Sequence, residues 1–152
     1  MSEEPGDREL ETPGAVEPAS VETVRLTLKK VLASGALHRI PRNPEHRDIV
    51  LAILCLDMHR RYPYSEVEMN AYLVAALEKF RAKFDHVTCR RYLADLAFVR
   101  RDRAGMRYFA NFPKLESVLS DAARAEAHQL VAGAVAHGSR RRKPGPRGKQ
   151  QS

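Results

Sequence analysis

The apolar residues of this chain recur at every third or fourth position through most of its central part, and this helical period stops only near residue 98. Each apolar run starts at a side chain that can accept hydrogen bonds from the free amides of a first helical turn. These capping residues are Ser20, Asn43, Ser65 and Asp85. The pattern therefore predicts four helices in succession, over residues 21–33, over 44–59, from 65 onward and over 86–97.

The predicted helices each direct one apolar stripe toward a common core. The residues expected to be buried include Val24, Leu28, Ile49, Ile53, Val67, Leu73, Val87 and Leu93. At the start of the third helix, Ser65 and Glu68 have the spacing of a capping box, in which each side chain accepts a hydrogen bond from the other residue's amide. A chain of 152 residues has room for one such core.

A change of period separates these four helices from the end of the chain. Residues 98–109 contain two short β-prone runs around Gly105, and glycine takes the positive φ that hairpin loops often need. This segment is predicted to be a β-hairpin, and a last helix is predicted over residues 113–136. Between the first two helices, Leu37–Pro41 is expected to form a short edge strand, because its prolines disfavour a helix.

The two ends of the chain carry opposite charges and little to bury. Residues 1–19 are rich in Glu, Pro and Gly, and residues 138–152 in Arg, Lys, Pro and Gly, so both are expected to be disordered. The folded domain is therefore expected over residues 20–137. Of the total net charge of +7, the first 20 residues carry −5 and residues 138–152 carry +6, which leaves +6 on the part between them. A basic domain of this kind attracts polyanions such as nucleic acids.

The order of the elements predicts a fold that is mainly α with a small β-hairpin. Three helices followed at once by a hairpin is the order of a winged helix-turn-helix, in which the third helix enters the major groove and the hairpin, or wing, lies along the backbone. Helix 86–97 would be the recognition helix and residues 98–109 the wing. The side chains expected to contact nucleic acid are His86, Thr88, Arg90, Arg91, Arg100, Arg101, Arg103 and Arg107.

Two further features belong to this hypothesis. Because strand side chains alternate, Arg100 and Arg101 are expected on opposite faces of the hairpin. The basic tail is expected to touch phosphates without reading bases, through Arg140, Arg141, Arg142 and Lys143.

Other classes of protein find little support in the sequence. No apolar run is long enough to span a bilayer, and the acidic start lacks the features of a secretory signal, so a cytoplasmic protein is expected. Cys55 and Cys89 lack the spacing of a zinc site, and no metal or cofactor is expected. Cys89 with His86 is an i, i+3 pair that resembles an activated thiolate, but a cysteine in this apolar setting usually packs. We expect no enzyme, because no phosphate loop or hydrolase motif is present.

Three motifs are similar to those of a known family. They are Tyr64-Ser-Glu-x-Glu-x-Asn70, Asp85-x-x-Thr-x-Arg-Arg-x-Leu93 and Val99-x-Arg-x-x-x-Gly-x-x-Tyr108. With the lead-in Arg39-Ile-Pro-Arg, they make Leu37 to Tyr108 resemble the bacterial family of domains of unknown function numbered 2087. Met69 and Cys89 stand where the family usually has valine and leucine, and the linker Lys79–Lys83 is longer. The resemblance implies transcriptional regulation, since such domains are often joined to ArsR-like or other helix-turn-helix modules.

Two roles remain open at this point. The first is a regulator that binds DNA, or else RNA, through the recognition helix, the wing and the tail. Such a regulator would form a homodimer through helix 21–33 or helix 113–136 if it reads a palindrome. The second is an interaction module that binds a protein or structured RNA, for example on a ribosome or polymerase, without reading DNA.

Overall fold

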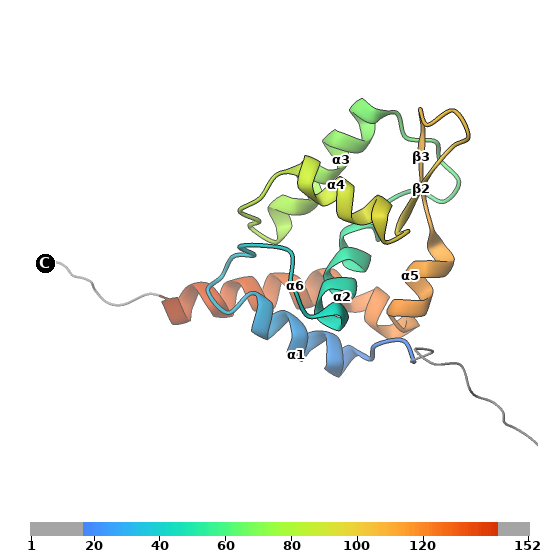
Figure 1. The fold of residues 1–152 in the computed structure, drawn as a ribbon. Helices are drawn as coiled ribbons and strands as arrows, with labels where there is room; N and C mark the ends of the chain where they lie inside the picture. The colour runs from blue at the N-terminus through green and yellow to red at the C-terminus, as the bar shows by residue number, and fades with distance from the viewer. Residues whose placement is uncertain (1–16, 143–152) are drawn as a thin grey trace, which may run out of the picture.

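The capping residues identified in the sequence begin four of the helices in the computed structural model of the protein, which describes residues 17–142 (Figure 1). Ser20 accepts a hydrogen bond from the Thr23 amide, and Asp85 accepts one from the Thr88 amide. The elements in chain order are α1 (Val21–Val31), α2 (Pro44–Leu54), α3 (Glu66–Lys79), α4 (His86–Asp95), β2 (Val99–Arg101), β3 (Tyr108–Ala110), α5 (Phe112–Val118) and α6 (Asp121–Arg142). The predicted fold class, mainly α with a small hairpin, is confirmed.

The capping box of α3 has both of its predicted hydrogen bonds. The Glu68 amide donates to Ser65 Oγ over 3.1 Å, and the Ser65 amide donates to Glu68 Oε1 over 2.9 Å. The bond from the Ser65 amide holds the pKa of Glu68 below its ordinary value, with a further contribution from the Tyr62 hydroxyl. The start of α3 is thus fixed by local chemistry alone.

Helix α2 ends five residues earlier than predicted, at Leu54 instead of residue 59. The Tyr72 hydroxyl of α3 donates to the Leu54 carbonyl over 2.6 Å and accepts a hydrogen bond from the Asp57 amide. The carbonyl therefore bonds to a side chain from another helix and not to the amide one turn ahead. A partner 18 positions away in the sequence sets the end of α2.

The predicted last helix, 113–136, is wrong in two respects. It is two helices, because the backbone of Ala19 pairs in parallel with Leu119 between them: the Ala19 amide donates to the Val118 carbonyl, and the Ser120 amide donates to the Ala19 carbonyl. Its second part, α6, continues to Arg142. Residues 138–142 are thus helical and do not form the start of a disordered tail. Ala19 is likewise held in place, while residues 1–16 and the rest of the tail from Lys143 lie outside the described residues.

Parallel packing of α1 and α6 forms one side of the molecule, and Figure 1 shows the two helices side by side. Just after the end of α1, the two backbones lie close together at Gly138, where a Cβ atom would be 2.3 Å from the Leu32 carbonyl oxygen and 2.4 Å from the Gly35 nitrogen. Only glycine allows this distance between the two backbones. The contact explains why α6 remains ordered beyond its predicted end.

The core centres on α2, in which every residue from Ile49 to Leu54 is buried. Helices α1, α3, α5 and α6 all contact it. Val24, Leu28, Leu73 and Leu93 are buried as predicted, but Val67 and Val87 are 77% and 45% exposed. The buried faces of α3 and α4 are set instead by Met69 and Cys89.

The predicted edge strand Leu37–Pro41 is also wrong, because no strand pairs with it. Within residues 37–41, Leu37 forms the backbone hydrogen bonds: its amide donates to the Phe80 carbonyl, and the Lys83 amide donates to its carbonyl. These bonds join the α1–α2 loop to the α3–α4 loop.

The hairpin is present as predicted, with Arg100 paired to Phe109 and Arg101 paired to Tyr108. In its loop, Gly105 has a φ of +73°, and the Asp102 carboxylate accepts a hydrogen bond from the Met106 amide. An antiparallel bridge joins Tyr108 to Tyr64, in the segment between α2 and α3. The hairpin is thereby tied to the helices on the side of β3.

Candidate nucleic-acid interface

The exposed face of α4 carries one basic side chain. Its exposed residues are Val87, Thr88, Arg91, Tyr92 and Asp95, opposite buried Cys89 and Leu93. Thr88 and Arg91 are therefore presented to solvent as the sequence predicted. His86 and Arg90, predicted to lie on the same face, are half-buried.

Arg90 points toward α3 and the hairpin, and its side chain is only 20% exposed. Its guanidinium donates a hydrogen bond to Asn70 Oδ1, lies 3.7 Å from a carboxylate oxygen of Glu66 and stacks over the Tyr108 ring. The i, i+4 geometry from His86 to Arg90 turns both side chains toward the edge of the buried stripe. Arg90 thus connects three elements of the domain.

Residues from all three sequence motifs meet around Tyr108. Tyr64 pairs with it through the backbone, with N–O distances of 2.8 and 2.9 Å. Arg90 and Arg101 both stack on its ring, with guanidinium carbons 5.9 and 5.1 Å from the ring centre. Asn70 belongs to the same cluster through Arg90. The motifs that looked like signatures of binding therefore contribute to the packing of the domain.

The wing arginines do not share one face. Arg101 lies over Tyr108 and donates to the Gly105 carbonyl over 3.0 Å, whereas Arg100 lies opposite Phe109 on the other face, as alternation predicted. Arg107 lies close enough to Glu68 to lower the pKa of that carboxyl, after the larger effects of Ser65 and Tyr62. These three arginines and Arg103 in the loop are all exposed. The predicted contact residues that are exposed on α4 and the hairpin are thus Thr88, Arg91, Arg100, Arg101, Arg103 and Arg107, of which Arg101 stacks on Tyr108 and Arg107 lies near Glu68.

Backbone hydrogen bonds stabilise the charged form of two aspartates in this region, Asp85 and Asp102. Amide donors lower the pKa of Asp85, chiefly that of Thr88, and the Met106 amide lowers the pKa of Asp102. Both carboxylates lie beside basic residues, so their negative charge is used locally to fix the start of α4 and the hairpin loop.

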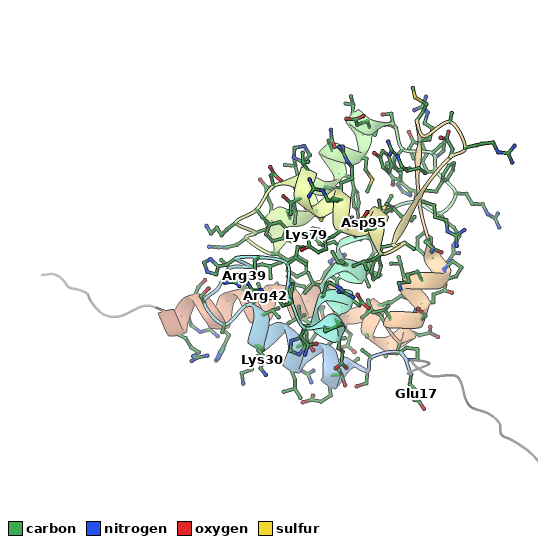
Figure 2. The ribbon with its side chains drawn as sticks, in the orientation of Figure 1. Glu17, Lys30, Arg39, Arg42, Lys79 and Asp95 are labelled. Carbon is green, nitrogen blue, oxygen red and sulfur yellow. The ribbon has the colours of Figure 1, made fainter. Side chains whose placement is uncertain are left out.

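A second basic surface was identified in the sequence only in part, through Arg140 and Arg141 of the predicted tail. Its eight exposed cations come from three segments: Lys29, Lys30, Arg39, Arg42, Arg81, Lys83, Arg140 and Arg141. We call this group the basic end. Figure 2 labels Lys30, Arg39 and Arg42, which lie toward the C-terminal end of α6. The signal in the sequence is a stretch from residue 23 to residue 44 without any acid, which a count over longer segments does not reveal.

A pocket of about 230 Å³ lies between α2, α3 and α6. Its walls are apolar, with Phe80 and Val131 among them, and Asp57, Lys79 and His128 form its polar rim. Asp57 accepts hydrogen bonds from Lys79 over 2.9 Å and from His128 over 2.8 Å. Partial burial acts to raise the pKa of Asp57, but these two hydrogen bonds outweigh it and the pKa lies below its ordinary value of 3.8.

The helices proposed for dimerisation bury their apolar faces against each other. Val24, Leu28 and Leu32 of α1 are buried in the same cluster as Ala127 and Val131 of α6. The apolar faces that a dimer through 21–33 or 113–136 would use are therefore already covered within one chain. Of the exposed large apolar side chains, Leu26 lies on α1, whereas Val67, Val74, Val87 and Tyr92 lie on α3 and α4.

Other kinds of site have few residues to support them. No helix within residues 17–142 is both long and apolar enough to cross a bilayer. Across the same residues, no three metal-binding side chains gather into a site. Burial raises the pKa of Cys55 far above its ordinary value and that of Cys89 to about 12, which is opposite to the shift of an activated thiolate.

Comparison with known proteins identifies one family. Neither the curated proteins nor the solved structures include a match to this chain. Residues 36–109 match the family model described as "Uncharacterized protein conserved in bacteria (DUF2087)". This segment runs from the loop after α1 to β3 and contains the cluster around Tyr108. The resemblance drawn from the three motifs is confirmed for residues 36–109, which are similar to the bacterial DUF2087 family over just under half of the chain.

Proposed function

We propose that this protein binds duplex DNA in the cytoplasm as a transcriptional regulator, through the exposed face of α4 and the hairpin. The observation that carries the proposal is the order α2, Tyr64, α3, α4, β2, β3, in which Tyr64 pairs with β3. That is the order of helices and strands in a winged helix. In such a domain, α4 would enter the major groove and the hairpin would follow the backbone.

The side chains on this surface suit a phosphate backbone with limited base contact. Arg91 and Thr88 are exposed on α4, and Arg100 and Arg103 are exposed on the hairpin. Within the described residues, none of these three arginines forms an ion pair with a carboxylate. Arginines without an internal partner retain their donors for phosphate oxygens or guanine.

The test is fluorescence-anisotropy binding of the full chain to mixed-sequence duplex DNA over a salt series. Each phosphate that a variant no longer neutralises lowers the slope of log K against log salt by about 0.9. The variant Arg91→Gln, Arg100→Gln, Arg103→Gln is therefore expected to lower the slope by roughly 2 to 3 if these side chains contact phosphates. The same binding measurement on a duplex RNA of matched sequence shows whether the protein prefers DNA or RNA.

The control removes a cation that already has a partner. Arg25 pairs with Glu22 on α1, so Arg25→Gln should leave the slope nearly unchanged. Equal slopes for the wild type and the triple variant would contradict the proposed interface, and failure of the wild type to bind either duplex at low salt would contradict the function. Arg90 is unsuitable for this test because its removal would disturb the cluster around Tyr108.

A second role, as a protein-interaction module, is favoured by the exposed valines on α3 and α4. Val67 is 77% exposed, Val74 47% and Val87 45%. Exposed apolar side chains that gather on one surface are typical of protein contacts. For this role, a photo-cross-linker at position 74 should trap a protein in cells, and Val67→Ser with Val87→Ser should abolish the adduct. An adduct that is insensitive to both valines would contradict it.

A further inference from the structure

The basic end gathers the C-terminal ends of three helices. The α1–α2 loop is bonded to the α3–α4 loop through Leu37, and α6 meets the end of α1 at Gly138. Figure 1 shows these loops and the end of α6 at one end of the molecule, with the hairpin at the other. Cations from all three segments are thereby brought to one end of the molecule.

The negative C-terminal ends of the helices offset only a small part of this positive charge. The C-terminus of a helix carries about half a negative charge, so α1, α3 and α6 together contribute about −1.5. The basic end contributes eight positive charges, and within residues 17–142 none of its eight side chains forms an ion pair. Most of this charge therefore has no partner within residues 17–142, and it attracts an anion with many charges.

The position of α4 relates this surface to the proposed interface. The helix begins just after Lys83 and ends just before β2, so it joins the basic end to the hairpin. Ten helical residues span about 15 Å, whereas duplex DNA carries one phosphate per roughly 1.7 Å of its axis. One duplex that lies along α4 reaches the cations at both of its ends.

We propose that the basic end is a second phosphate-binding surface, which holds the backbone of the same duplex beyond the N-terminus of α4. The inference rests on the proposed function and adds a set of contacts to it. Arg39 and Arg42 belong to the α1–α2 loop, which Leu37 bonds to the α3–α4 loop, and Figure 2 labels both. The footprint on DNA is then longer than α4 and the hairpin alone would cover.

An anionic membrane is the less suitable partner for these residues. Proteins that lie on membranes combine cations with apolar side chains that enter the lipid. Two exposed large hydrophobic side chains lie near the cations of the basic end: Leu26 one turn before Lys29 and Lys30, and Val74 in a pocket with Arg81 and Lys83. Arg39, Arg42, Arg140 and Arg141 have none in their own segments. A phosphate backbone requires only the cations.

The test compares salt slopes for full-length variants on one mixed-sequence DNA duplex. Arg39→Gln with Arg42→Gln is expected to lower the slope by about 1.8, at 0.9 for each phosphate. The matched control is Arg25→Gln with Arg60→Gln, which removes the same charge from two arginines that already pair with carboxylates and should leave the slope nearly unchanged. The triple variant at Arg91, Arg100 and Arg103 is measured in parallel.

The outcomes separate this inference from the proposed function. A slope that falls for the triple variant but not for Arg39→Gln with Arg42→Gln overturns only the second surface. A wild type that binds no DNA overturns both. Binding to vesicles of phosphatidylserine and phosphatidylcholine that depends on Arg39 and Arg42, while the DNA slope does not, assigns the surface to a membrane and also overturns the inference.

Discussion

The guanidinium carbon of Arg90 lies 5.9 Å from the centre of the Tyr108 ring and links the helix expected to read DNA to the hairpin behind it. The same side chain bonds to Asn70 of α3. A half-buried arginine with a stacking partner and a hydrogen-bond partner leaves both unsatisfied when it is removed. Arg90 thus belongs to the interior of the domain, although the sequence places it among surface residues.

Arg90→Ala is expected to lower the free energy of unfolding by about 2 kcal/mol, because it removes a charged hydrogen bond and a cation–π interaction. Urea denaturation measures this change. Arg91→Ala is the matched control, since Arg91 is exposed and should change stability by less than about 0.5 kcal/mol. Similar destabilisation by both variants would contradict the role given to Arg90.

Gly138→Ala is expected to destabilise the protein by about 2 kcal/mol, since the new Cβ would lie 2.3 Å from the Leu32 carbonyl oxygen and force α1 and α6 apart. Gly133→Ala provides the control on the same helix: a Cβ there meets nothing within 4 Å. Because alanine favours helix, this control should gain about 0.5 to 1 kcal/mol. Thermal unfolding of the pair checks both signs, and a stabilising Gly138→Ala would show that the two helices are not in close contact.

Asp57 is expected to make stability depend on pH at the acid end. Its pKa is below the ordinary value of 3.8 in the folded protein, so its ion pairs stabilise the fold above that pH and disappear as the pH falls toward the folded pKa. Urea titrations between about pH 2 and 6 should therefore show a smaller decrease in stability for Asp57→Asn than for the wild type. Parallel curves for the two proteins would indicate that Lys79 and His128 do not hold the carboxylate in solution.

The two thiols are expected to be unreactive in the native protein. Burial raises the pKa of Cys89 to about 12, and burial together with the neighbouring Cys89 raises that of Cys55 further. A disulfide reagent at pH 8 should titrate both thiols in guanidinium chloride and neither within minutes in buffer. Rapid reaction of Cys89 in buffer would show that α4 detaches from the core.

Local signals in the sequence predicted most of the fold. Ser20, Asn43, Ser65 and Asp85 cap helices as expected, because a cap needs only the amides two or three residues ahead. The hairpin was equally predictable, since Gly105 and Asp102, which shape its loop, belong to the loop itself. These features depend on neighbours in the chain, which a sequence displays directly.

The features that were missed depend on distant partners. Helix α2 ends early because Tyr72 bonds to Leu54, and the last helix divides because Ala19 pairs with the backbone between α5 and α6. Val67 was assigned to the core by its type, but Met69 occupies the face that α3 turns inward. For the site, Thr88, Arg91, Arg100 and Arg103 were predicted to be accessible and are, whereas the inward direction of Arg90 depends on Asn70. Most of the basic end was missed because its three segments meet only in the fold.

The bridge between Ala19 and Leu119 joins positions 100 residues apart, and it affects how the chain reaches its folded state. Helix α1 has its largest contact with α6, so during synthesis α1 is made long before its main packing partner. Closing so long a loop costs entropy before any contact is made, which slows folding and raises the contact order. Until α6 is made, Val24, Leu28 and Leu32 lack their main packing partner, so we expect part of this apolar face to stay open on the nascent chain.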